Sequence, residues 1–171
     1  RLRAHLHANE IADVVDIMAP LHAADAGDVL EALDADERNE LVRLLGDRFD
    51  FSALTEVDDA IRSDIVDSMP TEDIARGVST LDTDDAVYIL EDIDVPDREE
   101  ILAQMPAFER LSLRRSLDFP EDSAGRRMQT EFIAVAPTWN VGQAIDYMRE
   151  TVDLPERFYE LYVVDGDQKL L

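Results

Sequence analysis

The sequence predicts a mainly α-helical protein in which a superhelix of short amphipathic helices precedes an incomplete α/β domain. Three observations support this fold class. Apolar residues recur at the i, i+3, i+4, i+7 spacing of a helix face through residues 11–117. Parts of this region repeat along the chain, as expected for stacked units that cannot bury an apolar stripe alone. After residue 131 the helical period gives way to short apolar runs that are typical of buried strands.

The first helices are defined by their apolar stripes and by the residues that end them. The first two stripes comprise Ile11, Val14, Val15 and Met18, and then Ala26, Val29, Leu30 and Leu33. Pro20 ends the first stripe. Asp34 and Glu37 predict a capping box at the start of the next helix, which Gly46 ends. Residues 49–54 contain two phenylalanines and predict a loop with a short helix packed by aromatic rings.

The internal repeat is clearest in the stretch 81–106. Residues 30–34 (Leu-Glu-Ala-Leu-Asp) match residues 90–94 (Leu-Glu-Asp-Ile-Asp), and an Arg-x-(Asp/Glu)-(Ile/Leu) motif begins at Arg38, Arg62 and Arg98. The helix in this stretch has an apolar face made by Ala86, Ile89, Leu90 and Ile93. Acids cover the rest of this helix, and Asp82 and Asp94 stand where helices start, so we expect their side chains to accept hydrogen bonds from first-turn amides.

The composition changes at residues 118–130, where helix period is lost and Arg126 and Arg127 stand together in an acidic chain. We therefore expect a helical domain over residues 1–117, a junction over 118–130 and a second domain over 131–171. In the second domain, 132–135 and 161–164 predict strands, and Asn140 predicts a capped helix between them. Asp165 and Gly166 predict a tight turn into a further strand that is cut short, so we expect the full protein to continue.

The charge balance limits the classes of partner. Asp and Glu number 40 against 16 Lys plus Arg, which gives a formal net charge of -24. Nucleic acid is excluded as a partner because its binding requires clustered basic residues. Self-repulsion at this charge predicts that cations, and divalent cations above all, stabilise the fold. The chain has no cysteine, so it has neither disulfides nor thiolate metal sites.

No enzyme class is indicated. The glycines are dispersed and form no phosphate-binding loop, and no nucleophile motif is recognisable. His5 and His7 point to different sides of a helix, so we interpret them as surface histidines rather than as a metal site, and His22 stands alone. No apolar run is long enough for a membrane helix, and the N-terminus lacks a signal peptide.

These patterns together resemble the cytosolic part of MgtE-type magnesium transporters. The resemblance rests on the Leu-Asp-x-Asp-Asp unit at residues 81–85, on the junction Phe-Pro-Glu-Asp-Ser-Ala-Gly-Arg-Arg-Met at 119–128, and on Trp-Asn-Val-Gly-Gln-Ala-Ile-Asp-Tyr-Met at 139–148. It implies that residues 1–117 are the family's N-terminal helical domain and that residues 131–171 open its first CBS domain. It also implies a regulatory module rather than a catalyst, on the cytoplasmic side of the plasma (inner) membrane.

The resemblance implies a homodimer in which Mg²⁺ binds between helical and CBS domains and favours closure of a pore in the protein's own transmembrane domain. Asp84 matches a magnesium ligand of the family, and the backbone carbonyl of Arg126 matches another contact. The family often has a second aspartate where this sequence has Tyr88, so we expect the site to be weaker or to include Asp85 or Glu91. An adenine nucleotide would bind only with CBS segments beyond Leu171.

Two other interpretations stay open from the sequence. Stacked short helices also resemble FliG-like scaffolds, which bind protein partners without sensing an ion. The alternation of strand and helix after residue 131 argues against a pure scaffold. The acids Asp84 and Asp85 could also serve only to complement the positive end of a helix dipole.

Overall fold

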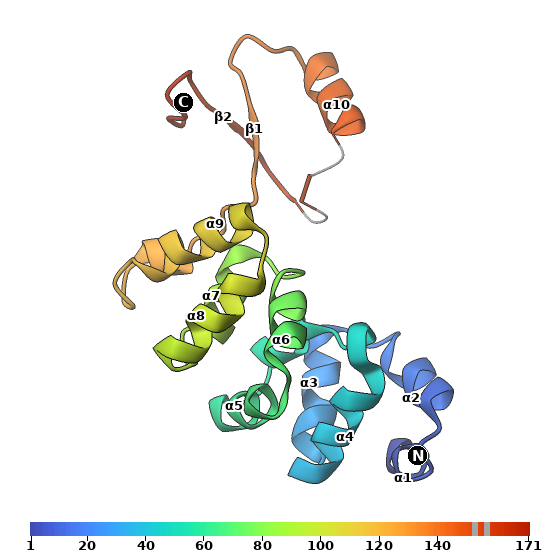
Figure 1. Cartoon of the computed structure of the whole chain (residues 1–171). Coiled ribbons are helices and arrows are strands. Elements are labelled where there is room, and N and C mark those ends of the chain that lie inside the picture. The colour runs from blue at the N-terminus through green and yellow to red at the C-terminus, as the bar shows by residue number, and fades with distance from the viewer. Residues whose placement is uncertain (152–153, 156–157) are drawn as a thin grey trace. The chain divides into compact units, whose positions relative to one another are not determined.

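The computed structural model describes residues 1–151, 154–155 and 158–171, so positions 152–153 and 156–157 of the predicted second domain lie outside the described residues. The chain divides into two compact units, Arg1–Met128 and Gln129–Leu171, each of which is described here by itself. Figure 1 labels the α-helices and the strands. Unit 1 contains α1 Leu2–His7, α2 Ile11–Met18, α3 Ala23–Ala32, α4 Ala35–Leu45, η1 Gly46–Arg48, η2 Phe51–Thr55, α5 Asp59–Ser68, α6 Thr71–Val78, α7 Thr83–Leu90, α8 Val95–Gln104, α9 Ala107–Leu117 and η3 Ala124–Arg127.

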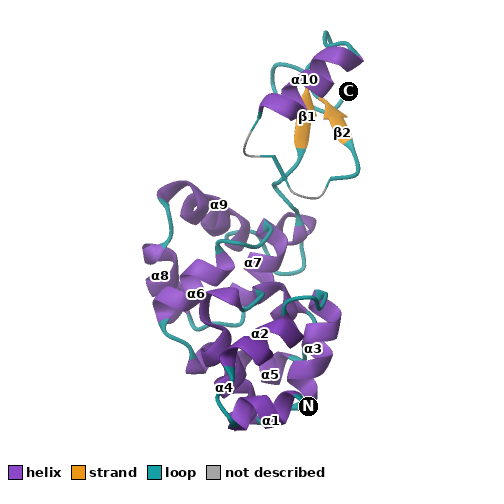
Figure 2. Ribbon diagram, turned by 90° about the vertical axis from the view of Figure 1, so that its right-hand side faces the viewer, coloured by secondary structure: helices purple, strands orange, loops and turns teal. Residues whose placement is uncertain are grey.

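Short helices pack on neighbours along the chain and on helices further away, as Figure 2 shows for unit 1. Helix α3 packs on η2, α6 on α8, and α7 on both α9 and η2. Their apolar stripes join into one hydrophobic core that runs from Leu6 to Leu113. The prediction of a mainly helical protein built from short amphipathic helices is confirmed. No helix in the described part of the chain has the length and apolar character needed to cross a membrane.

Helices begin at the positions that the sequence predicts, but the predicted N-cap side chains do not always make the expected hydrogen bonds. The Asp34 carboxylate accepts a bond from the Glu37 amide at 2.9 Å, and the Glu37 carboxylate accepts one from the Asp34 amide at 3.2 Å, so this capping box is confirmed. Asp82 and Asp94 occupy the N-cap positions of α7 and α8, but neither side chain makes a cap hydrogen bond. In both helices the N-cap residue takes part through its backbone carbonyl, which accepts the first intrahelical bond at 2.9 Å.

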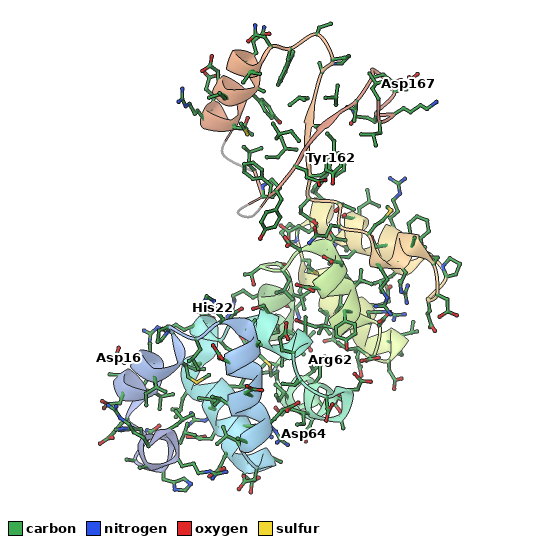
Figure 3. All side chains as sticks on the ribbon, turned by 180° about the vertical axis from the view of Figure 1, so that it is seen from behind. Asp16, His22, Arg62, Asp64, Tyr162 and Asp167 are labelled. Carbon is green, nitrogen blue, oxygen red and sulfur yellow. The ribbon has the colours of Figure 1, made fainter. Side chains whose placement is uncertain are left out.

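The repeated arginine has a common structural role in two of its copies. Arg38 in α4 donates to the Leu33 carbonyl at 2.7 Å and lies 3.5 Å from the Asp64 carboxylate in α5. Arg62 in α5 donates to Asp92, which follows α7. Figure 3 labels Arg62 and Asp64 among the helices of unit 1. Arg38 therefore links α4 to α5, and Arg62 links α5 to the turn that follows α7.

Unit 2 contains β1 Ile133–Val135, α10 Val141–Glu150 and β2 Leu161–Val163. The two strands pair in parallel, with Ile133 opposite Leu161 and Val135 opposite Val163. A capping box of Asn140 and Gln143, with bonds of 3.0 and 2.9 Å, starts α10 as predicted. The expected third strand is reduced to a single antiparallel bridge between Val164 and Leu170.

Candidate metal site at helix α7

Helix α7 is buried in the core of unit 1, and its first turn carries two of the predicted metal ligands. Four of its apolar residues are buried to 1% exposure or less: Ala86, Val87, Ile89 and Leu90. Thr83, the first helical residue, is also buried. Asp84 and Asp85 follow it directly, so both carboxylates stand in the first turn on a fixed backbone.

These two acids belong to a group of four carboxylates, which we call the α7 acid cluster: Glu56, Asp82, Asp84 and Asp85. Burial raises the pKa of Asp85, and the negative charges of Asp84, Asp82 and Glu56 raise it further. The Oδ1 atom of Asp84 is buried and has no hydrogen-bond partner among the described residues. Glu56 lies at the end of η2, which packs on α7, so tertiary packing brings it to the cluster.

Glu91, at the other end of α7, has a different environment. Its two carboxylate oxygens each contact a guanidinium, with Oε2 3.2 Å from Arg126 Nε and Oε1 2.7 Å from Arg127 Nη1. The Glu91 and Arg126 side chains are only 13% and 6% exposed. The negative charge of Glu91 is therefore already compensated, which disfavours it as a ligand for a further cation.

The Arg126 side chain is a structural anchor for the junction. It also donates to the backbone carbonyls of Leu117 and Phe119, and the latter contact is 3.4 Å. Ser123 is the N-cap residue of η3, and its hydroxyl oxygen accepts a hydrogen bond from the Arg126 amide at 3.3 Å. These bonds fasten η3 against α7 and α9. The backbone carbonyl of Arg126, which the resemblance offers as a metal contact, stays a prediction.

Tyr88 stands where the resemblance leads us to expect an acid, and it has a definite packing role. Its ring centroid lies 4.2 Å from the guanidinium carbon of Arg62 and 5.8 Å from that of Arg127. A guanidinium over an aromatic face is attracted by the ring quadrupole. The Tyr88 ring therefore contacts arginines from α5 and from η3.

The structure thus separates the predicted ligands into two environments. It brings Asp84 and Asp85 together with Glu56, and it places Glu91 among arginines. Sequence reasoning missed Glu56 and the buried Arg62. The repeat of the arginine motif was a usable signal for Arg62, whereas nothing in the local sequence around Glu56 indicates its proximity to α7. Grouped carboxylate oxygens are the ligands that hard cations such as Mg²⁺ prefer.

Unit 1 is a stack of short helices with acids in the first turn of α7, and unit 2 is a small α/β unit with two parallel strands. Residues 21–122 match the family described as the MgtE intracellular N domain. This match spans more than half of the 171 residues. The chain therefore belongs to the MgtE intracellular N domain family.

Individual relatives agree with this family. The magnesium transporter MgtE of Bacillus subtilis (strain 168) is 24% identical over 94 residues, which are 55% of this chain and 21% of that protein. The chain thus spans about a fifth of the length of this curated relative. Among solved structures, the soluble part of a magnesium transporter has a TM-score of 0.83 at 22% identity and matches 99% of this chain and 67% of its own. The cytosolic domain of the Mg²⁺ channel MgtE in complex with ATP also has a TM-score of 0.83, at 19% identity, over 99% of this chain and 69% of its own.

Proposed function

We propose that this chain is the magnesium-sensing regulatory module of an MgtE-type transporter or channel. The observation that carries the proposal is the α7 acid cluster. Carboxylates of Asp84 and Asp85 are crowded at one helix end, the pKa of Asp85 is raised, and a buried oxygen of Asp84 has no hydrogen-bond partner among the described residues. Mg²⁺ bound there would relieve this repulsion.

Coulomb energies indicate why a cation is needed. Two like charges about 4 Å apart repel by about 1 kcal/mol in water and by about 4 kcal/mol at an effective dielectric constant near 20. The helix dipole at the start of α7 offsets only about 0.3–1 kcal/mol of this repulsion. Mg²⁺ keeps several waters and takes one or two protein carboxylates, so Asp84 and Asp85 are sufficient protein ligands. Glu56 would attract the Mg²⁺ ion through the electrostatic field of its carboxylate or would accept a hydrogen bond from a water bound to the ion.

The gating mechanism follows from the same charge balance. At low Mg²⁺ the acidic surface would repel other acidic surfaces of the protein, and at high Mg²⁺ the bound ion would allow them to associate. We propose that the partners are the protein's own CBS and transmembrane domains and a second copy of the chain. Residues 131–171 would form the first part of the CBS domain, after a helical domain over residues 1–117 and a junction over 118–130.

Nucleotide binding is a separate part of the proposal. One similar structure was determined in complex with ATP. A complete CBS region of this protein would accordingly bind an adenine nucleotide, while Mg²⁺ is the ligand assigned to unit 1.

The first test compares thermal unfolding in MgCl₂ and in NaCl of equal ionic strength. For a site with a Kd near 1 mM, about 10 mM Mg²⁺ stabilises the folded state by about 1.4 kcal/mol. For a chain of this size this free energy corresponds to a rise in Tm of about 3–6 °C. Equal rises in the two salts would leave general screening as the whole effect and would contradict magnesium sensing.

Variants locate the site. Asp84→Asn removes one of the crowded charges, so we expect a higher Tm without Mg²⁺ and a smaller Mg²⁺-induced rise. Asp36→Asn, in the exposed first turn of α4, is the matched control and should keep the full rise. Glu91→Gln should lower Tm in both salts and leave the Mg²⁺-induced rise unchanged, because Glu91 pairs with arginines. A full Mg²⁺ response in Asp84→Asn would remove Asp84 from the site.

A scaffold function without ion sensing is the second candidate. It is favoured by two apolar residues of α9, Phe108 and Leu111, which are 85% and 68% exposed. If Mg²⁺ and Na⁺ act equally, binding of a protein partner through this face becomes the better explanation.

A further inference from the structure

The turn between α1 and α2 brings together a histidine and two acids that the proposed function does not use. The His5 Nδ1 atom lies 2.6 Å from Glu10 Oε2 and 4.0 Å from Asp13 Oδ2. One ligand atom from each residue lies within 4.8 Å of the other two. We propose that His5, Glu10 and Asp13 form a binding site for a transition-metal dication of the Zn²⁺ type.

The backbone of this turn is fixed by hydrogen bonds and by the core. Asn9 adopts a positive φ of 55°, and its amide donates to the Leu6 carbonyl at 2.9 Å. The next amide, of Glu10, donates to the His5 carbonyl at 3.0 Å. Leu6 and Val14 are 2% and 0% exposed and hold the two helices in the core. The Cα positions of the three ligands are therefore set before any metal binds.

The present spacing is close to that of a metal site. Zn²⁺ binds imidazole nitrogen and carboxylate oxygen at about 2.0–2.1 Å, and tetrahedral geometry then places neighbouring ligand atoms about 3.3 Å apart. One distance here is shorter than this value, at 2.6 Å, and the other is longer, at 4.0 Å. The Glu10 and Asp13 side chains are 52% and 54% exposed, so rotation of these side chains can bring their oxygens to the tetrahedral spacing.

The ligand types determine the class of metal. An imidazole with two carboxylates suits Zn²⁺, Co²⁺ or Ni²⁺, whereas Mg²⁺ takes oxygen ligands and is bound poorly by nitrogen. Glu10 is the N-cap residue of α2, and its side chain makes no cap hydrogen bond, so its carboxylate is not engaged in capping the helix. Three protein ligands leave a fourth position open to water.

This site differs from the interpretation of His5 as an isolated surface histidine. The second histidine, His7, is indeed no part of it, since its Nε2 faces Glu37 at 3.7 Å. The other two ligands, Glu10 and Asp13, come from the start of α2. The site also precedes residue 21, where the family match begins, and it shares no residue with the magnesium site proposed at α7.

The test is calorimetric titration of the chain with ZnCl₂ in the presence of about 10 mM MgCl₂, a hard cation that competes with Zn²⁺ for any site made of carboxylates alone. We expect a single site tighter than about 100 μM. His5→Ala should weaken Zn²⁺ binding by about tenfold or more, since even outer-shell changes at metal sites cost 10–100-fold. His7→Ala is the matched control and should bind as the unmodified chain does.

A second measurement guards against a loss of folding. Asp13→Asn preserves size and should weaken Zn²⁺ binding while leaving the helical circular dichroism unchanged. Co²⁺ bound at this site should give visible absorption bands that are lost in His5→Ala but kept in His7→Ala. No binding tighter than about 100 μM, or equal affinity in His5→Ala and the unmodified chain, would overturn the proposal.

Discussion

Arg62 and Asp92 should contribute unequally to stability, because only one of them is buried. The Arg62 side chain is 2% exposed, while its partners Asp92 and Asp59 are 41% and 80% exposed. The Nε and Nη1 atoms of Arg62 are buried without hydrogen-bond partners among the described residues, although the Tyr88 ring lies 4.2 Å away. Loss of Asp92 would leave a buried cation with weaker compensation, whereas loss of Arg62 would leave acids that water can solvate.

The magnitudes follow from this asymmetry. Breaking a buried ion pair from one side costs about 3–5 kcal/mol when the remaining charge is isolated. Asp59 and the Tyr88 ring still compensate Arg62 in Asp92→Ala, so we expect a cost of about 2 kcal/mol. In Arg62→Met, about 1 kcal/mol of cation–π attraction is lost, but the desolvated guanidinium and its unpartnered nitrogens are removed as well. The net change for Arg62→Met should lie within about 1 kcal/mol of zero.

The assay is urea unfolding followed by circular dichroism at the helical minimum, which reports mainly on the helices of unit 1. Urea is preferred because a guanidinium salt would screen the charges under study. Asp67→Ala is the control, since Asp67 is an exposed acid that lines the same small cavity as Arg62 and Asp92. If Asp92→Ala lowers the free energy of unfolding by no more than Arg62→Met does, the argument from the burial of Arg62 is refuted.

Three other changes probe packing, capping and ionisation. Gly77→Ala would place a Cβ 2.0–2.3 Å from ring atoms of the buried Phe51, so we expect a loss of about 3 kcal/mol by urea unfolding, while Gly166→Ala, with no atom within 4 Å, should be neutral. Asp34→Ala removes the capping box and should lower the free energy of unfolding by about 1 kcal/mol, seen as a lower urea midpoint. The pKa of Asp85 is raised in the folded state, so ionisation of its carboxyl lowers the free energy of unfolding. This loss of stability is complete at pH values above the folded-state pKa and absent at pH values below the pKa of the unfolded chain. Asp85→Asn should therefore be more stable than the unmodified chain at pH 7 without Mg²⁺, and unfolding curves of the two should converge in acid; a constant difference at all pH values would contradict this assignment.

Local signals allowed much of the fold to be predicted from the sequence. Capping boxes at Asp34 and Asn140 each depend on a residue three positions on, so a short window contains all the information. The apolar stripes likewise specify which face of each helix enters the core. N-cap positions at Asp82 and Asp94 were predicted correctly, but their side-chain bonds were not, because the orientation of an N-cap side chain depends on neighbours outside the helix.

The candidate sites depend on contacts that no short window contains. Arg62 meets Asp92 at a separation of 30 residues, and Arg126 meets Glu91 at a separation of 35. The sequence offered Glu91 as a ligand because it is an acid on the α7 helix, while its arginine partners come from the junction. Only packing decides whether an acid keeps its charge available for a metal.

The two ends of α7 therefore differ in how their negative charge is compensated. At the C-terminal end Glu91 meets two arginines of the chain itself, so its charge is compensated without an added cation. At the N-terminal end the pKa of Asp85 is raised by burial and by neighbouring acids, which indicates that compensation from the chain is incomplete. An external cation can change the energy only where compensation is incomplete. In a chain with a net charge of -24, responsiveness to Mg²⁺ should accordingly be confined to sites such as the first turn of α7 rather than spread evenly over every acid.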